Sequence, residues 1–168
     1  IAGTLEGLLR IRDEVAPKLQ SQLDETARTL ISAFAETDNS GSGLPPLQGL
    51  FTWPGGPALP PTGSIVHGLA GNIAVNSAYD LQTGGDPLLL RDGGSNGVAY
   101  NANPVGYPAF ADRLIFLAEQ FTEEFAFAPD VGFGSDLTMG AFVARASAWI
   151  SGQRSSATSE QEQTEAKL

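Results

Sequence analysis

The chain has 168 residues, enough for one domain with a sizeable core, and its hydrophobic content of 42% is ordinary for a globular protein. The formal net charge of −10 disfavours nucleic acid as a partner, because phosphates require a surface rich in lysine and arginine. Cysteine is absent, which excludes disulfides, thiolate catalysis and cysteine zinc sites, and the single histidine, His67, would have to carry any histidine-dependent mechanism alone.

No apolar run is long enough to span a membrane and no signal peptide is visible, so we expect no membrane partner. The chain starts at Ile1 without a methionine and stops inside a helix-like pattern, which we interpret as a fragment of a longer protein. No internal repeat occurs at the periods of solenoid proteins.

The stretch 5–37 predicts a long amphipathic helix, because large apolar residues recur along it at steps of three and four. Charged residues lie between them, and Asp24 and Arg28 have the i, i+4 spacing of a pair on a solvated face. Pro17 interrupts the pattern, and we expect it to kink the helix near Asp13. The predicted core stripe comprises Leu5, Leu8, Val15, Leu19, Leu23, Leu30 and Phe34.

The segment 37–43 (TDNSGSG) is rich in turn-forming residues and should end this helix. It begins with the alternating oxygen ligands of a calcium loop, but Gly49 stands where the twelfth, bidentate acid is required, so we interpret it as a turn. The following stretch, 44–64, is dense in proline and glycine, and we expect an ordered surface loop anchored by Phe51 and Trp53.

The stretch 65–76 contains β-branched and apolar residues, which predict one or two short strands around a glycine-containing turn. His67 lies between apolar neighbours here, and since no nucleophile motif accompanies it we expect a buried or half-buried structural residue. The cluster RDGGSNG at 91–97 has no phosphate-binding spacing and predicts a turn.

A second helix is predicted over 108–127, beginning at Pro108, and a third from residue 139, capped by Ser135 or Asp136. The third helix becomes polar over 151–168, where small and polar residues fill its heptad seam. This extension is either a frayed tail or a helix that needs partners to stay ordered. The predicted buried residues of the two helices include Phe110, Leu114, Leu117, Phe121, Phe125, Phe142 and Ile150.

Taken together, these patterns predict a mainly α protein: a long-helix bundle with a small β element and long Pro/Gly-rich loops. We expect one helix-rich domain over 1–168, which includes the loop at 44–64 and the polar helix extension at 151–168. We predict no catalytic, cofactor-binding or metal-binding residue.

The opening helix resembles a segment of bacterial flagellar hook-associated protein 1, the first hook–filament junction protein. The run GTLEGLLRIRDEVAPKLQSQLD follows that family's Leu-Leu, Arg-Asp, Pro, Gln and Leu-Asp spacing, and GNIAVNSAYDLQTGGDPLLLRDGG at 71–94 resembles a later strand and turn. The matching positions are Gly3, Leu5, Gly7, Leu8, Leu9, Arg10, Arg12, Asp13, Pro17, Gln20, Leu23, Asp24, Ala27, Leu30 and Phe34.

The resemblance implies the C-terminal part of such a protein without its terminal axial helices. It would be a structural, non-enzymatic subunit of the extracellular flagellum, exported without a cleaved signal peptide. Its partners would be the hook protein, the second junction protein and further copies, with an export chaperone as another candidate. Helices 5–37 and 139–168 should then run antiparallel, and the expected assembly surface includes Arg10, Arg12, Asp24, Gln153, Ala157, Gln161 and Thr164.

Several alternatives remain open at this level. Another axial protein (flagellin, the second junction protein or a hook protein) would share the same helical character. A secreted binding module could use Trp53 and its proline-rich loop, which predicts a concave pocket there. A hydrolase could pair Glu123 with Asp112, although Glu119 and Glu123 share the spacing of a solvated helix face.

Overall fold

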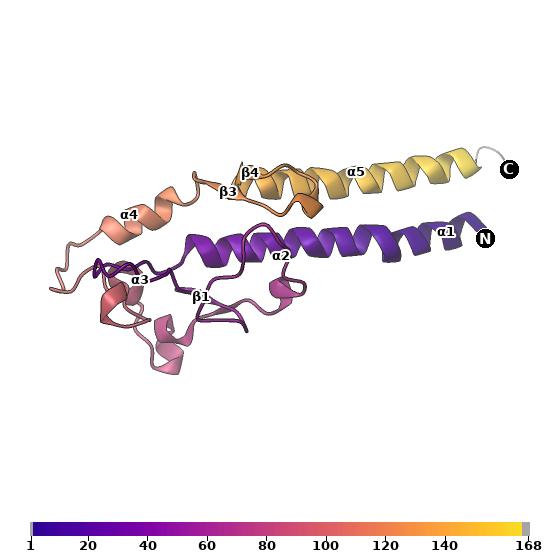
Figure 1. The fold of residues 1–168 in the computed structure, drawn as a ribbon. Coiled ribbons are helices and arrows are strands. Elements are labelled where there is room, and N and C mark those ends of the chain that lie inside the picture. The colour runs from indigo at the N-terminus through magenta and orange to yellow at the C-terminus, as the bar shows by residue number, and fades with distance from the viewer. Residues whose placement is uncertain (1, 166–168) are drawn as a thin grey trace.

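Two long helices lie side by side in the computed structural model, which describes residues 2–165, and the rest of the chain forms a body at one end of them (Figure 1). The first comprises α1 (Ala2–Arg10), a π-helical turn (Ile11–Val15) and α2 (Ala16–Ala33). The second, α5 (Met139–Glu165), runs back antiparallel to it. The two chain ends therefore lie together, at the end of the helices remote from the body.

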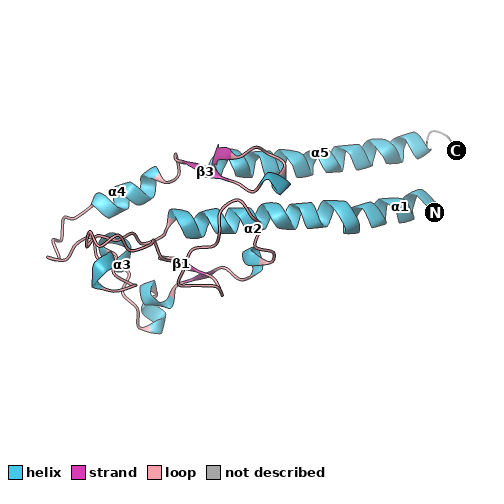
Figure 2. Ribbon diagram, viewed as in Figure 1, coloured by secondary structure: helices cyan, strands magenta, loops and turns pink. Residues whose placement is uncertain are grey.

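The remaining elements are short (Figure 2). Strand β1 (Phe51–Thr52) pairs antiparallel with β2 (Ala74–Val75), and β3 (Glu124–Ala126) pairs antiparallel with β4 (Asp136–Thr138). Helices α3 (Leu89–Asp92) and α4 (Asp112–Glu119) pack against each other. A mainly α fold with a small β element is confirmed; the described residues form a pair of long helices, and a long-helix bundle is not confirmed.

Pro17 is accommodated by the π-helical turn that precedes it. Proline has no N–H to donate and its ring collides with the carbonyl four residues earlier, which here belongs to Asp13 in the middle of that turn. A π turn widens the helix at this point and is a known way of absorbing such an interruption. The helix remains continuous from Ala2 to Ala33.

The predicted apolar stripe of the first helix is wrong over much of its length. Leu5, Leu8 and Leu23 are exposed, and Val15, Leu19, Leu30 and Phe34 are only half-buried. The buried face is rotated from the leucines and combines Ala27 and Ile31 with polar side chains: Gln22, Asp24, Glu25, Arg28 and Thr29. For Asp24, Glu25 and Arg28 the physical reason is that loops cover this face, and their backbone N–H and C=O groups need polar partners that leucine does not offer.

Two small apolar clusters form the core. Ala27 and Ile31 of α2 pack with Leu69, and Phe51 and Trp53 lie against them. The second cluster joins Phe127 to Phe142 of α5, whose rings stack with centroids 3.9 Å apart, and includes Val131. Ile150, expected in the core of α5, is half-buried.

The predicted helix over 108–127 is also wrong in its extent, since α4 covers only Asp112–Glu119. The N–H and hydroxyl of Thr122 both donate to the Glu119 carbonyl, which closes the last turn, and the chain continues as β3. Of the residues predicted to be buried in this segment, Leu117 is buried, Phe110 and Phe125 are half-buried, and Leu114 and Phe121 are exposed.

The start of α5 and the segment around His67 also differ from expectation. Residues Ser135 and Asp136 do not cap α5; Asp136 belongs to β4, and the Thr138 hydroxyl accepts a hydrogen bond from the Ala141 N–H. His67 is exposed in a turn. It was expected to be at least half-buried in a strand, but the chain turns there to place Leu69 in the core, leaving the imidazole in solvent.

Candidate assembly surface

The helical arm comprises α1 with the π-helical turn after it (residues 2–15) and the polar half of α5 (residues 151–165), which extend away from the body (Figure 1). A polar contact centred on Arg10 joins its two helices. The Arg10 guanidinium donates from Nη1 to Glu160 Oε1 at 3.1 Å and from Nη2 to Gln153 Oε1 at 3.0 Å. Because Glu160 is largely exposed, this ion pair contributes no more than about 1 kcal/mol. Its main effect is to fix the register of the two helices.

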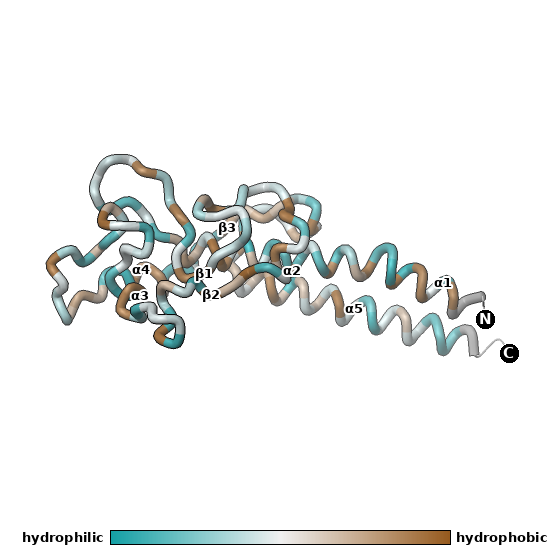
Figure 3. Tube along the Cα trace, turned by 90° about the horizontal axis from the view of Figure 1, so that it is seen from below, coloured by the Kyte–Doolittle hydropathy of each residue, from teal (hydrophilic) through white to brown (hydrophobic). Residues whose placement is uncertain are grey.

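Large apolar side chains of the arm remain uncovered. Leu5 is 58% exposed, Leu8 60% and Ile11 54%, and Leu9 beside them is also exposed. Figure 3 shows apolar and polar segments alternating along α1, next to a stretch of α5 with a larger polar share. Isolated exposed leucines are common, but neighbouring ones on a single helix are typical of surfaces that another chain covers.

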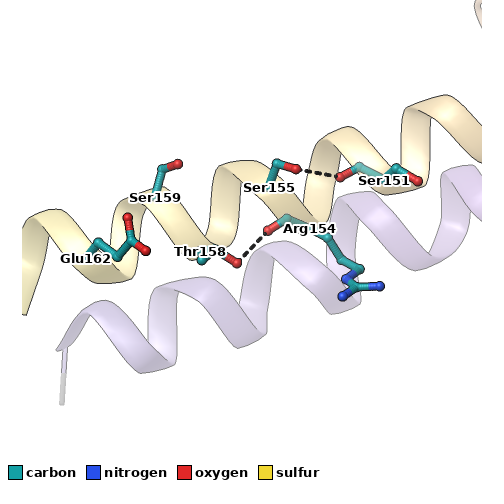
Figure 4. A pocket seen from close by; sticks show the side chains of 6 residues that line it. All are labelled: Ser151, Arg154, Ser155, Thr158, Ser159 and Glu162. Carbon is teal, nitrogen blue, oxygen red and sulfur yellow. Dashed lines mark hydrogen bonds between the residues drawn. The ribbon is translucent and has the colours of Figure 1, made fainter.

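The polar half of α5 carries a shallow groove along one face (Figure 4). Its lining residues recur at steps of three and four. The hydroxyls of Ser155 and Thr158 fold back onto the carbonyls of Ser151 and Arg154, at 3.2 and 3.1 Å. The face therefore presents small hydroxyl side chains, two of which bond within the helix, between the longer Arg154 and Glu162, and a neighbouring backbone could approach it at the small residues. The groove is lined by Ser151, Arg154, Ser155, Thr158, Ser159 and Glu162.

The residues predicted for the assembly surface do not all lie on it. Arg10 and Gln153 join the two helices, and Arg12 is exposed and paired with Asp13 at 2.6 Å. Ala157 and Gln161 are exposed on α5, whereas the side chain of Thr164 lies outside the described residues.

Asp24 is a clear error in that prediction, because its side chain is 1% exposed. Its carboxylate accepts hydrogen bonds from the backbone N–H groups of Gly68 and Ala70, at 2.9 and 2.8 Å, and from the Gln20 side chain. The residue holds the loop that carries Leu69 against α2. Its role is therefore internal to the body.

Further buried carboxylates anchor other loops to the first helix. Glu25 and Arg28 form an ion pair at 2.8 Å, and both side chains are almost completely buried. Glu25 also accepts from the Ala128 N–H, and Arg28 donates to the Ala126 carbonyl. This pair therefore binds the end of β3 and the segment after it to α2.

Glu36, just after α2, binds the loop at 95–96. Its carboxylate is fully buried and accepts from the Tyr79 hydroxyl, the backbone N–H groups of Ser95 and Asn96, and the Asn96 amide, at 2.8–3.0 Å. Burial acts to raise the pKa of Glu36, but these hydrogen bonds outweigh it, and the pKa lies below its ordinary value. Burial also raises the pKa of Tyr79 to about 12.

The remaining sequence candidates have structural explanations. The Asp38 carboxylate accepts from the N–H and hydroxyl of Ser40 and from the Leu44 N–H, so its oxygens are used within the turn after the helix. The Ser40 hydrogen bonds lower the pKa of Asp38 to about 2. Within the described part of the chain, no cluster of histidine, aspartate or glutamate has the arrangement of a metal site.

Trp53 is held by its own loop. Its indole Nε1–H donates to the Ala58 carbonyl at 2.8 Å, and the ring packs against the cluster around Ile31. Gly55 lies so close to the ring that a Cβ on it would be 2.3 Å away. The loop is therefore collapsed onto the indole, which counts against a ligand platform at this position.

None of the helices over residues 2–165 is long and apolar enough to cross a membrane. Comparison with known proteins adds no relative: no family model matches the chain, and no curated protein or solved structure is similar to it. The flagellar interpretation therefore depends on the sequence pattern and on the physical character of the arm.

Proposed function

We propose that this protein is a structural subunit of the bacterial flagellum at the hook–filament junction, acting by subunit packing without catalysis. The choice of family is based on the resemblance of the opening helix to the first junction protein. The observation that carries the proposal is the arm: its exposed Leu5, Leu8 and Ile11 form an apolar surface that the arm's own second helix does not cover. Such a surface is stabilised when neighbouring helices pack on it.

In this proposal the long-helix bundle forms only in the assembly. The apolar side of α1 and the small-residue groove of α5 offer two different surfaces to helices of neighbouring subunits. The neighbours would be the hook protein, the second junction protein and further copies, outside the cell. The body would remain folded by itself, because its loops are anchored internally by Asp24, Glu25 and Glu36.

The test is a substitution that introduces one negative charge on the arm, made in the bacterium that produces the protein. Leu8→Glu should abolish swimming and leave hooks without filaments, because a carboxylate on the packing surface must be desolvated on assembly. The matched control is Val98→Glu, at a position on the body that is 94% exposed. Both purified variants should keep the wild-type melting temperature, since both side chains lie in solvent in the isolated chain. Normal motility of the Leu8→Glu strain would contradict the proposal.

Immunogold labelling separates this proposal from its nearest alternative, another axial protein. Label confined to the boundary between hook and filament is expected for a junction protein. Label along the filament would indicate flagellin, and label along the hook would indicate a hook protein. Either of these patterns would overturn the junction assignment while retaining a structural role.

A further inference from the structure

A second unpartnered surface lies on α4, at the end of the molecule opposite the two chain termini (Figure 1). In this helix and the turn after it, Arg113 and Leu117 are buried and Gln120 is half-buried, a single stripe at steps of four and three. Within its own bounds the helix thus touches the body along one narrow stripe, and the turn after it makes a further contact through Phe121. The rest of its circumference is exposed.

Much of this exposed circumference is apolar. Ile115 is 54% exposed, Leu114 40% and Phe121 53%, and Ala118 lies between them on the helix. With about 100° between successive residues, these side chains occupy one continuous sector next to the buried stripe. The ring of Phe121 makes an edge-to-face contact with Phe34, with centroids 5.9 Å apart. The sector has the i, i+4, i+7 spacing by which helices anchor in a partner.

The sector next to the apolar one is acidic. Asp112 and Glu119 lie on the helix, Glu123 lies in the bend after it, and Glu124 begins the next strand; all are exposed. None of these carboxylates forms an ion pair with a described lysine or arginine. An apolar surface bordered by unpaired negative charge therefore faces solvent at this end of the molecule.

We propose that α4 docks an amphipathic helix of another protein, one that is apolar on the contacting side and bordered by lysine or arginine. The negative charge of the acidic sector indicates a basic partner. Basic residues at the rim would pair with the acidic sector and speed association, while leucine-like side chains would bury Leu114 and Ile115. This inference does not depend on the arm or on the flagellar proposal.

The same charge argues against other occupants. A second copy docking through α4 would place two acidic sectors together, which is unfavourable. Of the chain's own cations, Arg10, Arg12 and Arg91 are already paired with carboxylates, and Arg154 lies in the groove of α5, away from α4. An anionic lipid surface would repel the acidic sector for the same reason.

The test uses a fluorescent synthetic peptide of about four helical turns, with leucine on one face and lysine on the other. Its binding to the whole chain is measured by fluorescence anisotropy. A Leu114→Ser/Ile115→Ser double variant should weaken binding by about tenfold or more, because it removes the central apolar contacts. The matched control, Leu81→Ser/Val98→Ser, removes exposed side chains elsewhere on the body and should bind as the wild type does.

Two further measurements address charge and self-association. Glu119→Gln/Glu123→Gln should weaken binding and flatten its dependence on salt, since exposed charge pairs are screened by ions. A peptide with glutamate in place of lysine should not bind. Equal binding by the α4 variant and its control, equal binding of the two peptides, or self-association that Ile115→Ser abolishes would each overturn the proposal.

Discussion

Replacement of Glu36 tests whether buried carboxylates hold the loops on the first helix. In Glu36→Ala the Tyr79 hydroxyl can turn toward Ser95 Oγ, 3.3 Å away, and the Asn96 amide keeps its bond to the Gln48 carbonyl. The backbone N–H groups of Ser95 and Asn96 have no such replacement. Since each of these two stranded donors costs about 1–3 kcal/mol, the free energy of unfolding should fall by about 2–6 kcal/mol.

Glu36→Gln should cost less, about 1–3 kcal/mol, because its amide oxygen still accepts one N–H while its NH₂ group faces the other. The assay is urea unfolding followed by the fluorescence of Trp53, which packs in the adjoining core, and by far-UV circular dichroism. Glu123→Gln, an exposed acid, is the control and should change stability by less than about 0.5 kcal/mol. A Glu36→Ala protein as stable as this control would refute the reasoning.

The pH dependence gives an independent check on the same residue. The pKa of Glu36 is lowered on folding from its ordinary 4.5, so the ionised carboxylate stabilises the folded state above that pH. The contribution disappears as the pH falls from 4.5 through the lower folded pKa. Wild-type stability should therefore decline more steeply than that of Glu36→Gln in this acid range. Parallel declines would show that Glu36 is not the titrating group.

Two other predictions concern the same body. Tyr79→Phe should remove a loss of stability at alkaline pH. The pKa of Tyr79 is raised on folding from 10.0 to about 12, so the wild type loses stability as the pH rises through this interval. Urea unfolding of the variant should show no such loss. Gly49→Ala should lower the melting temperature by several degrees, because its Cβ would lie 2.2 Å from the Phe34 carbonyl oxygen. The control is Gly71→Ala, whose Cβ meets nothing within 4 Å and which should melt like the wild type. Identical melting of the two glycine variants would contradict the close approach at Gly49.

The sequence predicted the long helices reliably, because a 3.6-residue period over many turns is strong local information. It also indicated the turn at 37–43 and an interruption at Pro17, whose missing N–H is a covalent fact. The combined patterns of the elements were likewise sufficient to predict a mainly α protein with little β structure. These features depend on neighbouring residues and need no knowledge of the rest of the chain.

Which face of the first helix is buried was decided by tertiary structure. The leucines suggested one face, yet positions 24, 27, 28 and 31 have the same helical spacing and lie inside. The loops that cover them bring backbone N–H and C=O groups, so Asp24 and Arg28 are more favourable there than leucine. Glu36 had no sequence pattern to mark it, because the donors that surround it come from more than 40 residues away.

The same distinction between local sequence and tertiary structure applies to the two unpartnered surfaces, on the arm and on α4. The sequence by itself determined that α1 has apolar residues and that the end of α5 does not, and it determined the acids around α4. Only the tertiary structure decided that Leu5 and Leu8 remain exposed beside a polar helix and that α4 touches the body along one stripe. Burial depends on contacts between segments that are distant in the sequence. A local sequence pattern gives the residue types on a helix face, but it does not determine which segment packs on that face.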